Sequence, residues 1–270
     1  MNHAGATGTA PPPESDSTPA AAAYGPDLAA IHDAGFGGFA TAAAPGLLRL
    51  LRRAGIRGGL VVDLGCGSGI WARDLTAAGY RVLGVDISPA MLALAHRRAP
   101  AARFVHASLL RFEPPPCDAV TSLGECVNYL FDEQAESLDA LGRMCRRVHD
   151  ALRPGGVFVC EVAQPGQVRG RQPRRGHREG DGWAILFEVE EDAHTKVLTR
   201  RMTTFRRQGG EGGEGGGSYR RSEEVHRQRL YETEEMLGAL TAAGFRVRTS
   251  RRLGAHRLAP AHLAFIATRS

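Results

Sequence analysis

The sequence predicts an α/β fold in which helices cover both faces of a mostly parallel β-sheet. Short apolar runs alternate with helix-like segments between residues 60 and 163. The first run, Leu60–Val62, leads into a glycine-rich turn and then into a helix-like segment from Trp71 to Ala78, which is the start of a nucleotide-binding βα unit. Consecutive βα units require right-handed crossovers, so we expect a mostly parallel sheet.

The elements of this fold can be placed along the chain. A length of 270 residues suits one such domain with an insertion, and a hydrophobic content of 43% is enough for a core. Strands are expected at residues 60–64, 81–85, 103–106, 118–122 and 157–162. Helices are expected at residues 24–34, 43–54, 69–78, 89–98 and 132–151. Ser88 and Pro89 are a good helix start, with serine as the N-cap and proline in the first turn.

The pattern changes after Val162. Residues 164–182 are rich in glycine, arginine and proline and are expected to form a loop. Three segments with polar alternation follow and predict an inserted antiparallel sheet, at residues 183–190, 196–206 and 219–231. The run GGEGGEGGG at residues 209–217 predicts a mobile hairpin tip. A helix at 233–243, capped by Thr233, and strands near 245–252 and 261–268 complete the chain.

Composition excludes several classes of protein. Residues 1–22 are rich in Ala, Pro, Ser and Thr and predict a disordered tail without the features of a signal peptide. No segment is apolar enough to cross a membrane. Only Lys196 is a lysine, so 33 of the 34 basic residues are arginine, which is typical of a GC-rich bacterial genome. The formal charge of +5 is therefore weak evidence for binding of nucleic acid. The five cysteines lack metal spacing and fit a reducing cytoplasm.

The glycine-rich turn indicates which ligand the first βα unit binds. A dinucleotide fingerprint needs a glycine three residues after Gly67, where Ile70 stands, and a phosphate-binding loop needs a Gly-Lys-Ser/Thr ending that is absent. What remains is an acid, Asp63, before three alternate glycines, which suits an ammonium or sulfonium ligand. Asp86 follows Gly65 at the usual distance for an acid that binds both ribose hydroxyls.

Four segments resemble the class I S-adenosylmethionine (SAM)-dependent methyltransferases in order and spacing: VVDLGCGSG (61–69), VLGVDIS (82–88), CDAVTSLGECVNYL (117–130) and LRPGGVFVCEV (152–162). The resemblance implies a Rossmann-like sheet of seven strands, the last of them antiparallel. The SAM-binding domain would comprise residues 23–163 and 232–270, with lid helices at 23–55. The insertion at 164–231 would cap the carboxyl ends of the strands.

The resemblance also implies roles for individual residues. SAM would be the cofactor, S-adenosylhomocysteine (SAH) its product, and no metal would be required. Asp63 would face the methionine amino group, Asp86 the ribose hydroxyls, and Ser108 the adenine amino group, where many relatives carry an acid. The remaining cofactor contacts would be Gly65, Cys66, Gly67 and Gly69 in the loop, Ile87 and Met91 against adenine, and Leu123 and Gly124 at the methionine end.

The acceptor is expected to be a small molecule bound in a closed, partly aromatic pocket. The Asn/Asp-Pro-Pro-Tyr/Phe motif of enzymes that methylate nucleic-acid bases is absent after the fourth strand, and the acidic cluster of catechol-type magnesium sites is not evident. Candidate catalytic residues are His32, as a base, together with Glu125 and Tyr129. Candidate substrate contacts are Tyr24, Phe36, Asn128, His226 and Tyr231, although Asn128 would alternatively cap the turn after the strand.

These observations predict a cytoplasmic SAM-dependent methyltransferase, monomeric or homodimeric, that methylates a nitrogen or oxygen atom of a small molecule. Two alternatives remain open. One is an RNA or protein methyltransferase, which only the arginine content favours. The other is a non-catalytic SAM-binding or scaffold protein, which would bind SAM without turnover.

Overall fold

The computed structural model describes residues 23–132, 138–168, 170, 172–208 and 218–270. The tail expected at residues 1–22 and the hairpin tip expected at 209–217 lie outside the described residues. Within the described part of the chain, no helix is both long and apolar enough to span a membrane.

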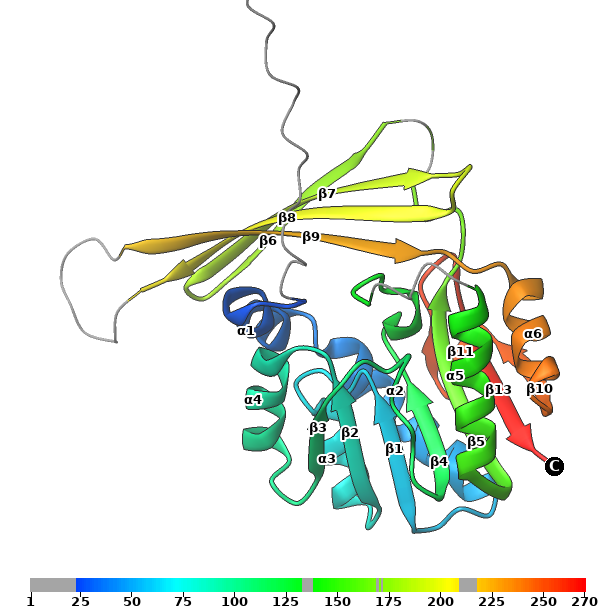
Figure 1. Ribbon diagram of the computed structural model, residues 1–270. Coiled ribbons are helices and arrows are strands. Elements are labelled where there is room, and N and C mark those ends of the chain that lie inside the picture. Colours follow the sequence, from blue (N-terminus) through cyan, green and yellow to red (C-terminus); the bar gives the residue numbers. More distant parts are fainter. Residues whose placement is uncertain (1–22, 133–137, 169, 171, 209–217) are drawn as a thin grey trace, which may run out of the picture.

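The larger of the two main sheets has seven strands in the order β10-β13-β5-β4-β1-β2-β3 (Figure 1). Its strands are β1 (Leu60–Leu64), β2 (Arg81–Asp86), β3 (Arg103–His106), β4 (Cys117–Ser122), β5 (Leu152–Ala163), β10 (Phe245–Ser250) and β13 (His262–Arg269). Strands β1 to β5 pair in parallel, whereas β13 is antiparallel to both β5 and β10. The expected α/β fold with an antiparallel last strand is therefore confirmed.

Helices cover both faces of this sheet. The helices are α1 (Pro26–Gly35), α2 (Gly38–Arg53), α3 (Ile70–Ala77), α4 (Pro89–Arg98), the short 3₁₀ helix η1 (Cys126–Asn128), α5 (Leu138–Ala151) and α6 (Thr233–Ala242). One apolar core joins α5 and α6 to the sheet through residues such as Met144 and Leu240. A second core joins α2 and α3 to the other face through Leu47 and Trp71. Burial of these apolar side chains is the main stabilising contribution.

A separate antiparallel sheet has four strands, β6 (Arg174–Gly180), β7 (Trp183–Asp192), β8 (Val197–Arg207) and β9 (Tyr219–Arg229). It lies across the end of the larger sheet at which the parallel strands terminate, with α1 beneath it (Figure 1). The expectation of a loop through residues 164–182 is wrong for β6. This edge strand has no buried residue and so lacks an apolar pattern, and a tight turn at Asp181-Gly182 pairs it with β7.

Two smaller expectations also differ from the structure. The N-cap of α6 is Glu232, which forms a capping box with Glu235, whereas Thr233 accepts a hydrogen bond from the side chain of Gln164. The helix expected at residues 43–54 begins earlier, at Gly38, so the glycine-rich break between α1 and α2 is short. A short hairpin of β11 (Arg252–Leu253) and β12 (His256–Arg257) precedes β13.

The inserted segment leaves and rejoins the larger sheet at adjoining points. The backbone N–H of Tyr231 donates to the carbonyl oxygen of Ala163 at 3.3 Å. The side chain of Asn128, which is fully buried, spans the same junction: its amide nitrogen donates to the carbonyl oxygens of Ala163 (2.9 Å) and Arg229 (2.6 Å), and its oxygen accepts from the N–H of Ala163 (3.0 Å). Asn128 therefore fixes where the second sheet is attached.

Candidate active site

A cavity of about 710 Å³ lies between the ends of the parallel strands, helix α1 and the inner face of the second sheet. This volume is in the range typical of small-molecule sites. Most of the residues expected at the cofactor and the acceptor line it: Tyr24, His32, Phe36, Asp63, Gly65, Cys66, Gly67, Asp86, Ile87, Met91, Ser108, Leu123, Gly124, Glu125 and Tyr129. The location agrees with the rule that open α/β sheets bind ligands at the carboxyl ends of their strands.

The glycine loop between β1 and α3 is shaped by positive φ angles. Gly65, Gly67 and Gly69 have φ values of 79°, 52° and 76°. A Cβ on Gly65 would collide with the Cys126 side chain, whereas a Cβ on Gly67 would meet no other atom within 4 Å. Gly67 therefore leaves open space at the cavity wall, while Gly65 allows the loop after β4 to pack directly on the glycine loop. Gly69 caps α3 outside the cavity lining.

Asp86 at the end of β2 is held by two backbone groups. Its Oδ2 accepts from the N–H of Gly67 and its Oδ1 from the N–H of Ser88, both at 2.8 Å. Each carboxylate oxygen keeps a further lone pair, so Asp86 can still accept from two ligand hydroxyls. Burial raises the pKa of Asp86 above its ordinary value.

Asp63 at the end of β1 is a buried acid at the cavity wall, only 3% exposed. Trp71 Nε1 donates to Thr121 Oγ1 (3.2 Å), and Thr121 Oγ1 donates to Asp63 Oδ1 (2.7 Å). Burial raises the pKa of Asp63 to about 7, and the Thr121 hydrogen bond only partly opposes this. A cationic ligand would restore the charged form, and an ammonium or sulfonium group therefore fits this part of the cavity.

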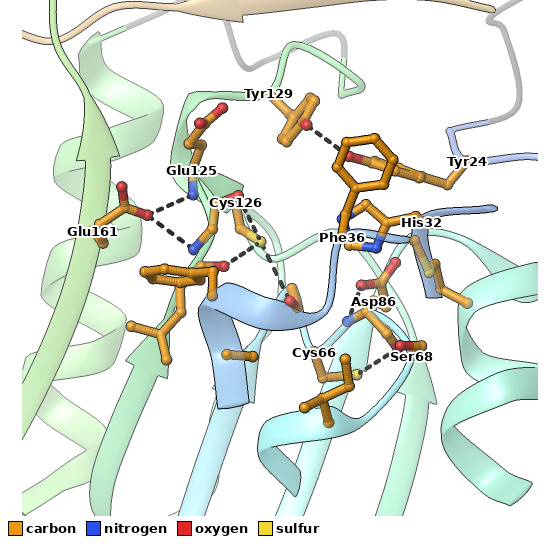
Figure 2. A pocket seen from close by; sticks show the side chains of 18 of the residues that line it. Tyr24, His32, Phe36, Cys66, Ser68, Asp86, Glu125, Cys126, Tyr129 and Glu161 are labelled. Atoms are coloured by element: carbon orange, nitrogen blue, oxygen red, sulfur yellow. Dashed lines mark hydrogen bonds between the residues drawn. The ribbon is translucent and has the colours of Figure 1, made fainter. Parts of the chain in front are cut away.

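The loop after β4 forms the opposite wall and is held from the side by Glu161 of β5 (Figure 2). Glu161 Oε2 accepts from the backbone N–H groups of Gly124 and Glu125, both at 3.0 Å. These two residues have φ values of 76° and 64°, and Glu125 thus adopts a conformation unusual for a residue with a side chain. The Cys126 thiol donates to the carbonyl oxygens of Gly65 (3.3 Å) and Leu123 (3.0 Å), which ties the two loops together.

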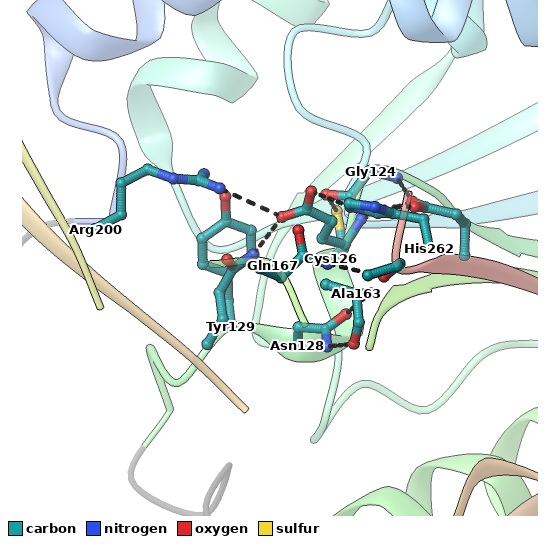
Figure 3. Close-up of polar contacts among 12 residues, drawn as sticks. Gly124, Cys126, Asn128, Tyr129, Ala163, Gln167, Arg200 and His262 are labelled. Atoms are coloured by element: carbon teal, nitrogen blue, oxygen red, sulfur yellow. Dashed lines mark hydrogen bonds and ion pairs between the residues drawn. The ribbon is translucent and has the colours of Figure 1, made fainter. Parts of the chain in front are cut away.

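The side chain of Glu125 is the centre of a polar cluster that reaches the second sheet and includes His262 and Arg200, which are labelled in Figure 3. His262 Nε2 lies 2.7 Å from Glu125 Oε1, Gln228 Nε2 donates to Oε2 at 2.6 Å, and Arg200 Nη2 lies 3.8 Å from Oε2. Burial alone would raise the pKa of Glu125, but the contacts with His262, Arg200 and Gln228 lower it to about 2. Burial would lower the pKa of His262, but its contact with Glu125 raises this pKa to about 8.

An aromatic group borders the cavity beside this cluster (Figure 2). The hydroxyls of Tyr24 and Tyr129 are 2.8 Å apart, and burial raises the pKa of both, that of Tyr129 to about 12. His32 packs edge-on against Tyr24 and is stacked on Phe36. Burial lowers the pKa of His32 to about 4, and its Nδ1 has no hydrogen-bond partner in the described structure. His32 is therefore neutral near pH 7 and offers an unused ring nitrogen.

Three residues expected at the acceptor do not line the cavity. Asn128 is occupied by backbone groups at the junction of the second sheet, as its alternative role as a turn cap suggested. Tyr231 is 2% exposed and packs in the core with α5 and α6. His226 is also 2% exposed; its Nε2 contacts Glu224 Oε2 at 2.9 Å, and its ring packs against Tyr24 and Tyr129. His226 thus supports residues of the site from behind.

The sequence did not indicate three residues that shape the cavity: Glu161, Arg200 and His262. Glu161 lies in a motif used to recognise the family, and a single acid within the apolar run VFVCEV was an available signal. Arg200 lies between Leu198 and Met202 on the buried face of β8, but in a chain with 33 arginines its presence there did not mark it as a site residue. His262 begins an apolar strand, and the residues around it gave no indication that it belongs to the site. In the described residues, no three His, Cys, Asp or Glu side chains are grouped as metal ligands would be.

Comparison with known proteins identifies the family. A family model for a methyltransferase domain matches residues 61–156. The dTDP-3-amino-3,6-dideoxy-alpha-D-glucopyranose N,N-dimethyltransferase of Streptomyces fradiae is 30% identical over 211 residues, which cover 76% of this chain and 76% of that enzyme. The chain belongs to the SAM-dependent methyltransferases.

Further comparisons place this methyltransferase among its relatives. It is 38% identical to the trans-aconitate 2-methyltransferase of Paracidovorax citrulli over 140 residues, which cover 51% of this chain and about half, 52%, of that relative. It shares its fold with a SAM-dependent methyltransferase of known structure from Clostridium acetobutylicum, with a TM-score of 0.74 at 16% identity, covering 90% of this methyltransferase and 98% of the other chain.

Proposed function

We propose that this methyltransferase transfers the methyl group of SAM to a nitrogen or oxygen atom of a small molecule held in the cavity beneath the second sheet. The observation that carries this proposal is the continuity of the cavity. It runs from Asp86 and the glycine loop, past Glu125, to the inner face of β7 and β8. One continuous volume of small-molecule size therefore brings the cofactor residues and an acceptor wall together, which suits a small molecule better than RNA or a protein.

The residues of the cofactor half fit SAM in charge and in shape. Asp63 is a buried acid suited to the amino group or sulfonium, Asp86 has free acceptor positions for two hydroxyls, and Gly67 leaves space at the wall. We assign adenine contacts to Ile87, Met91 and Ser108, and contacts at the methionine end to Leu123 and Gly124. When bound, SAM supplies an activated methyl group that an aligned nucleophile displaces in line.

The acceptor half of the cavity orients the nucleophile and receives its proton. Such alignment can contribute roughly 7–11 kcal/mol to lowering the barrier. We assign alignment to the Tyr24–Tyr129 hydroxyl pair and to Phe36, with Glu125 fixing the position of Tyr129 through Arg200. His32 is neutral, and its Nδ1 has no partner among the described residues; we assign to it the role of hydrogen-bond acceptor for a proton on the nucleophile.

The two relatives suggest acceptors for a first test. The Streptomyces fradiae relative is named for N,N-dimethylation of an amino sugar attached to dTDP, and the Paracidovorax citrulli relative for trans-aconitate. Purified protein would be incubated with methyl-labelled SAM and, separately, with trans-aconitate, a dTDP-amino sugar, a pool of small metabolites, total RNA and a protein extract. Label in a small molecule supports the proposal. Label only in RNA or protein, or SAH-binding protein that labels no pool, contradicts it.

We further propose that the enzyme acts in the bacterial cytoplasm, without a metal ion and as a monomer or homodimer. Support comes from the bacterial sources of its relatives and from five cysteines that are all unpaired. Methyl transfer from SAM has no chemical need for a metal when the nucleophile arrives neutral or anionic. Activity that survives dialysis against EDTA, and a mass of one or two chains by light scattering, are the expected results.

A further inference from the structure

Arg200 positions Tyr129 in the proposed reaction, but that role does not use its positive charge. It projects from the inner face of β8 between Leu198 and Met202, lines the cavity and keeps 26% of its side chain exposed. Figure 3 shows it reaching past Tyr129 toward the cluster around His262. A buried charge is costly unless it is matched, and such charges at a cavity wall often mark a binding site.

The partners of Arg200 leave much of its guanidinium unused. Within the described part of the chain, it contacts the hydroxyl of Tyr129 and approaches Glu125 Oε2 at 3.8 Å, which is too long for a hydrogen bond. A guanidinium has five N–H donors, so these contacts engage a minority of them. Glu125 is moreover shared, because His262 lies 2.7 Å from its other oxygen. Arg200 is therefore held in place by the cluster without being fully neutralised by it.

The neighbours of Arg200 on the β7 side of the second sheet are apolar, whereas its direct neighbour on β9 is His226. Ile185, Phe187 and Val189 of β7 and Met202 of β8 line the same wall, and Val189 is the direct neighbour of Arg200 on β7. These side chains offer no hydrogen-bond acceptor to the free N–H groups. A ligand that filled this part of the cavity would thus need oxygen atoms at Arg200 and an apolar body beside it. The planar fork of arginine matches a carboxylate or a phosphate by two parallel hydrogen bonds.

We propose that Arg200 is a specificity-determining residue that binds an oxyanion, a carboxylate or phosphate group, on the methyl acceptor. This inference rests on the proposed methyl transfer to a small molecule and narrows its acceptor to an anionic class. The oxyanion lies next to Glu125 and thus close to the loop assigned to the methyl-bearing end of the cofactor. Arg200 then fixes the acceptor by its charged group, and the apolar wall of β7 selects the rest of the molecule.

The test measures binding to the SAH-saturated protein by calorimetry. The probes are trans-aconitate and benzoate as carboxylates, inorganic phosphate as the other oxyanion, and trimethyl trans-aconitate and methyl benzoate as neutral counterparts. We expect at least one oxyanion to bind and its neutral counterpart not to bind. Arg200→Gln should weaken that binding about 10- to 100-fold, as expected for the loss of hydrogen bonds between charged groups. Arg200→Lys keeps the charge but loses the planar fork of the guanidinium, and its affinity for the oxyanion should lie between those of the wild type and Arg200→Gln.

Arg201→Gln is the matched control, because Arg201 is the next residue on β8 but points to the exposed face of the sheet. It removes the same charge and should leave binding of the oxyanion unchanged. All variants should bind SAH as the wild type does, which shows that they are folded. The proposal is overturned if no oxyanion binds the wild-type complex, if Arg200→Gln binds it equally well, or if Arg201→Gln weakens binding as much. Failure of the wild type to bind SAH would instead contradict the proposed function.

Discussion

Glu161 of β5 accepts hydrogen bonds from the loop that carries Glu125, and the surroundings of these two acids shift their pKa values in opposite directions. Burial raises the pKa of Glu161 to about 7, whereas His262, Arg200 and Gln228 overcome the effect of burial on Glu125 and lower its pKa to about 2. Glu161 holds the loop backbone beside the glycine loop, and Glu125 extends from the same loop to the second sheet. The parts of the cavity that we assign to the cofactor and to the acceptor therefore meet at one short segment.

The first prediction concerns this segment. Glu161→Leu removes the acceptor of the N–H groups of Gly124 and Glu125, and each hydrogen bond lost costs about 0.5–1.5 kcal/mol. We expect a clear loss of thermal stability and weaker binding of SAH, because the loop lines the cavity assigned to the cofactor. Glu161→Gln keeps a carbonyl oxygen and should recover much of both. Melting curves and calorimetry with SAH provide the measurements, and a Leu variant as stable and as tightly binding as the wild type would contradict the role given to Glu161.

The second prediction concerns Asp86. Asp86→Ala should weaken SAH binding by about 10- to 100-fold, because hydrogen bonds to a charged group contribute about 1.5–3 kcal/mol. The matched control is Glu113→Ala, which removes an exposed carboxyl group elsewhere on the surface. Calorimetry of both variants decides the assignment: equal affinity of Asp86→Ala and wild type would exclude Asp86 as the ribose ligand.

The third prediction is a dependence of stability on pH. The pKa of His262 is raised from 6.5 to about 8 in the folded protein. Its stabilising contribution is therefore complete below pH 6.5 and is lost as the pH rises through 8, and amounts to roughly 2 kcal/mol. Denaturant melts of wild type and His262→Gln from pH 6 to 9 should show the difference in unfolding free energy shrinking with pH. The dependence should be smaller in a Glu125→Gln background, and a difference that grows with pH would contradict the assignment.

The fourth prediction concerns helix α1, which covers the cavity. Asp33 of α1 is paired with Arg98 of α4 at 2.9 Å, and Arg98 also donates to the carbonyl oxygen of Ser68 in the glycine loop at 2.7 Å. Loss of a hydrogen bond between charged groups costs about 1.5 kcal/mol, so Asp33→Asn should speed limited proteolysis within residues 24–40 about tenfold.

Bound SAH should slow cleavage of both the wild type and the Asp33→Asn variant, because it fills the cavity beneath α1. The exposed Asp150 offers a control, and Asp150→Asn should be cut at the wild-type rate. If Asp33→Asn were cut no faster than the wild type, the ion pair would not be what holds α1 over the cavity.

The larger sheet could be predicted because its strands and turns carry local signals. Buried parallel strands appear as continuous apolar runs, and the glycines and acids at their ends are fixed by backbone geometry within a few residues. The acceptor wall depends instead on how an inserted sheet is paired and placed. Whether Arg200 faces the cavity or the solvent depends on which alternate residues of β8 point to the inner face of the sheet. The contact of Glu125 with His262 joins residues 137 positions apart. No local pattern encodes either relationship, and the exposed strand β6 had no apolar pattern at all.

The attachment of the second sheet at Ala163, Asn128 and Tyr231 has an evolutionary consequence. Because the insertion departs and returns through adjoining backbone groups, its length and sequence can change without disturbing the register of the seven-stranded sheet. Recombination between relatives at these two points would exchange the wall that we assign to the acceptor and retain the half assigned to the cofactor. A lineage with such a junction can acquire new acceptors by replacing one contiguous stretch of gene.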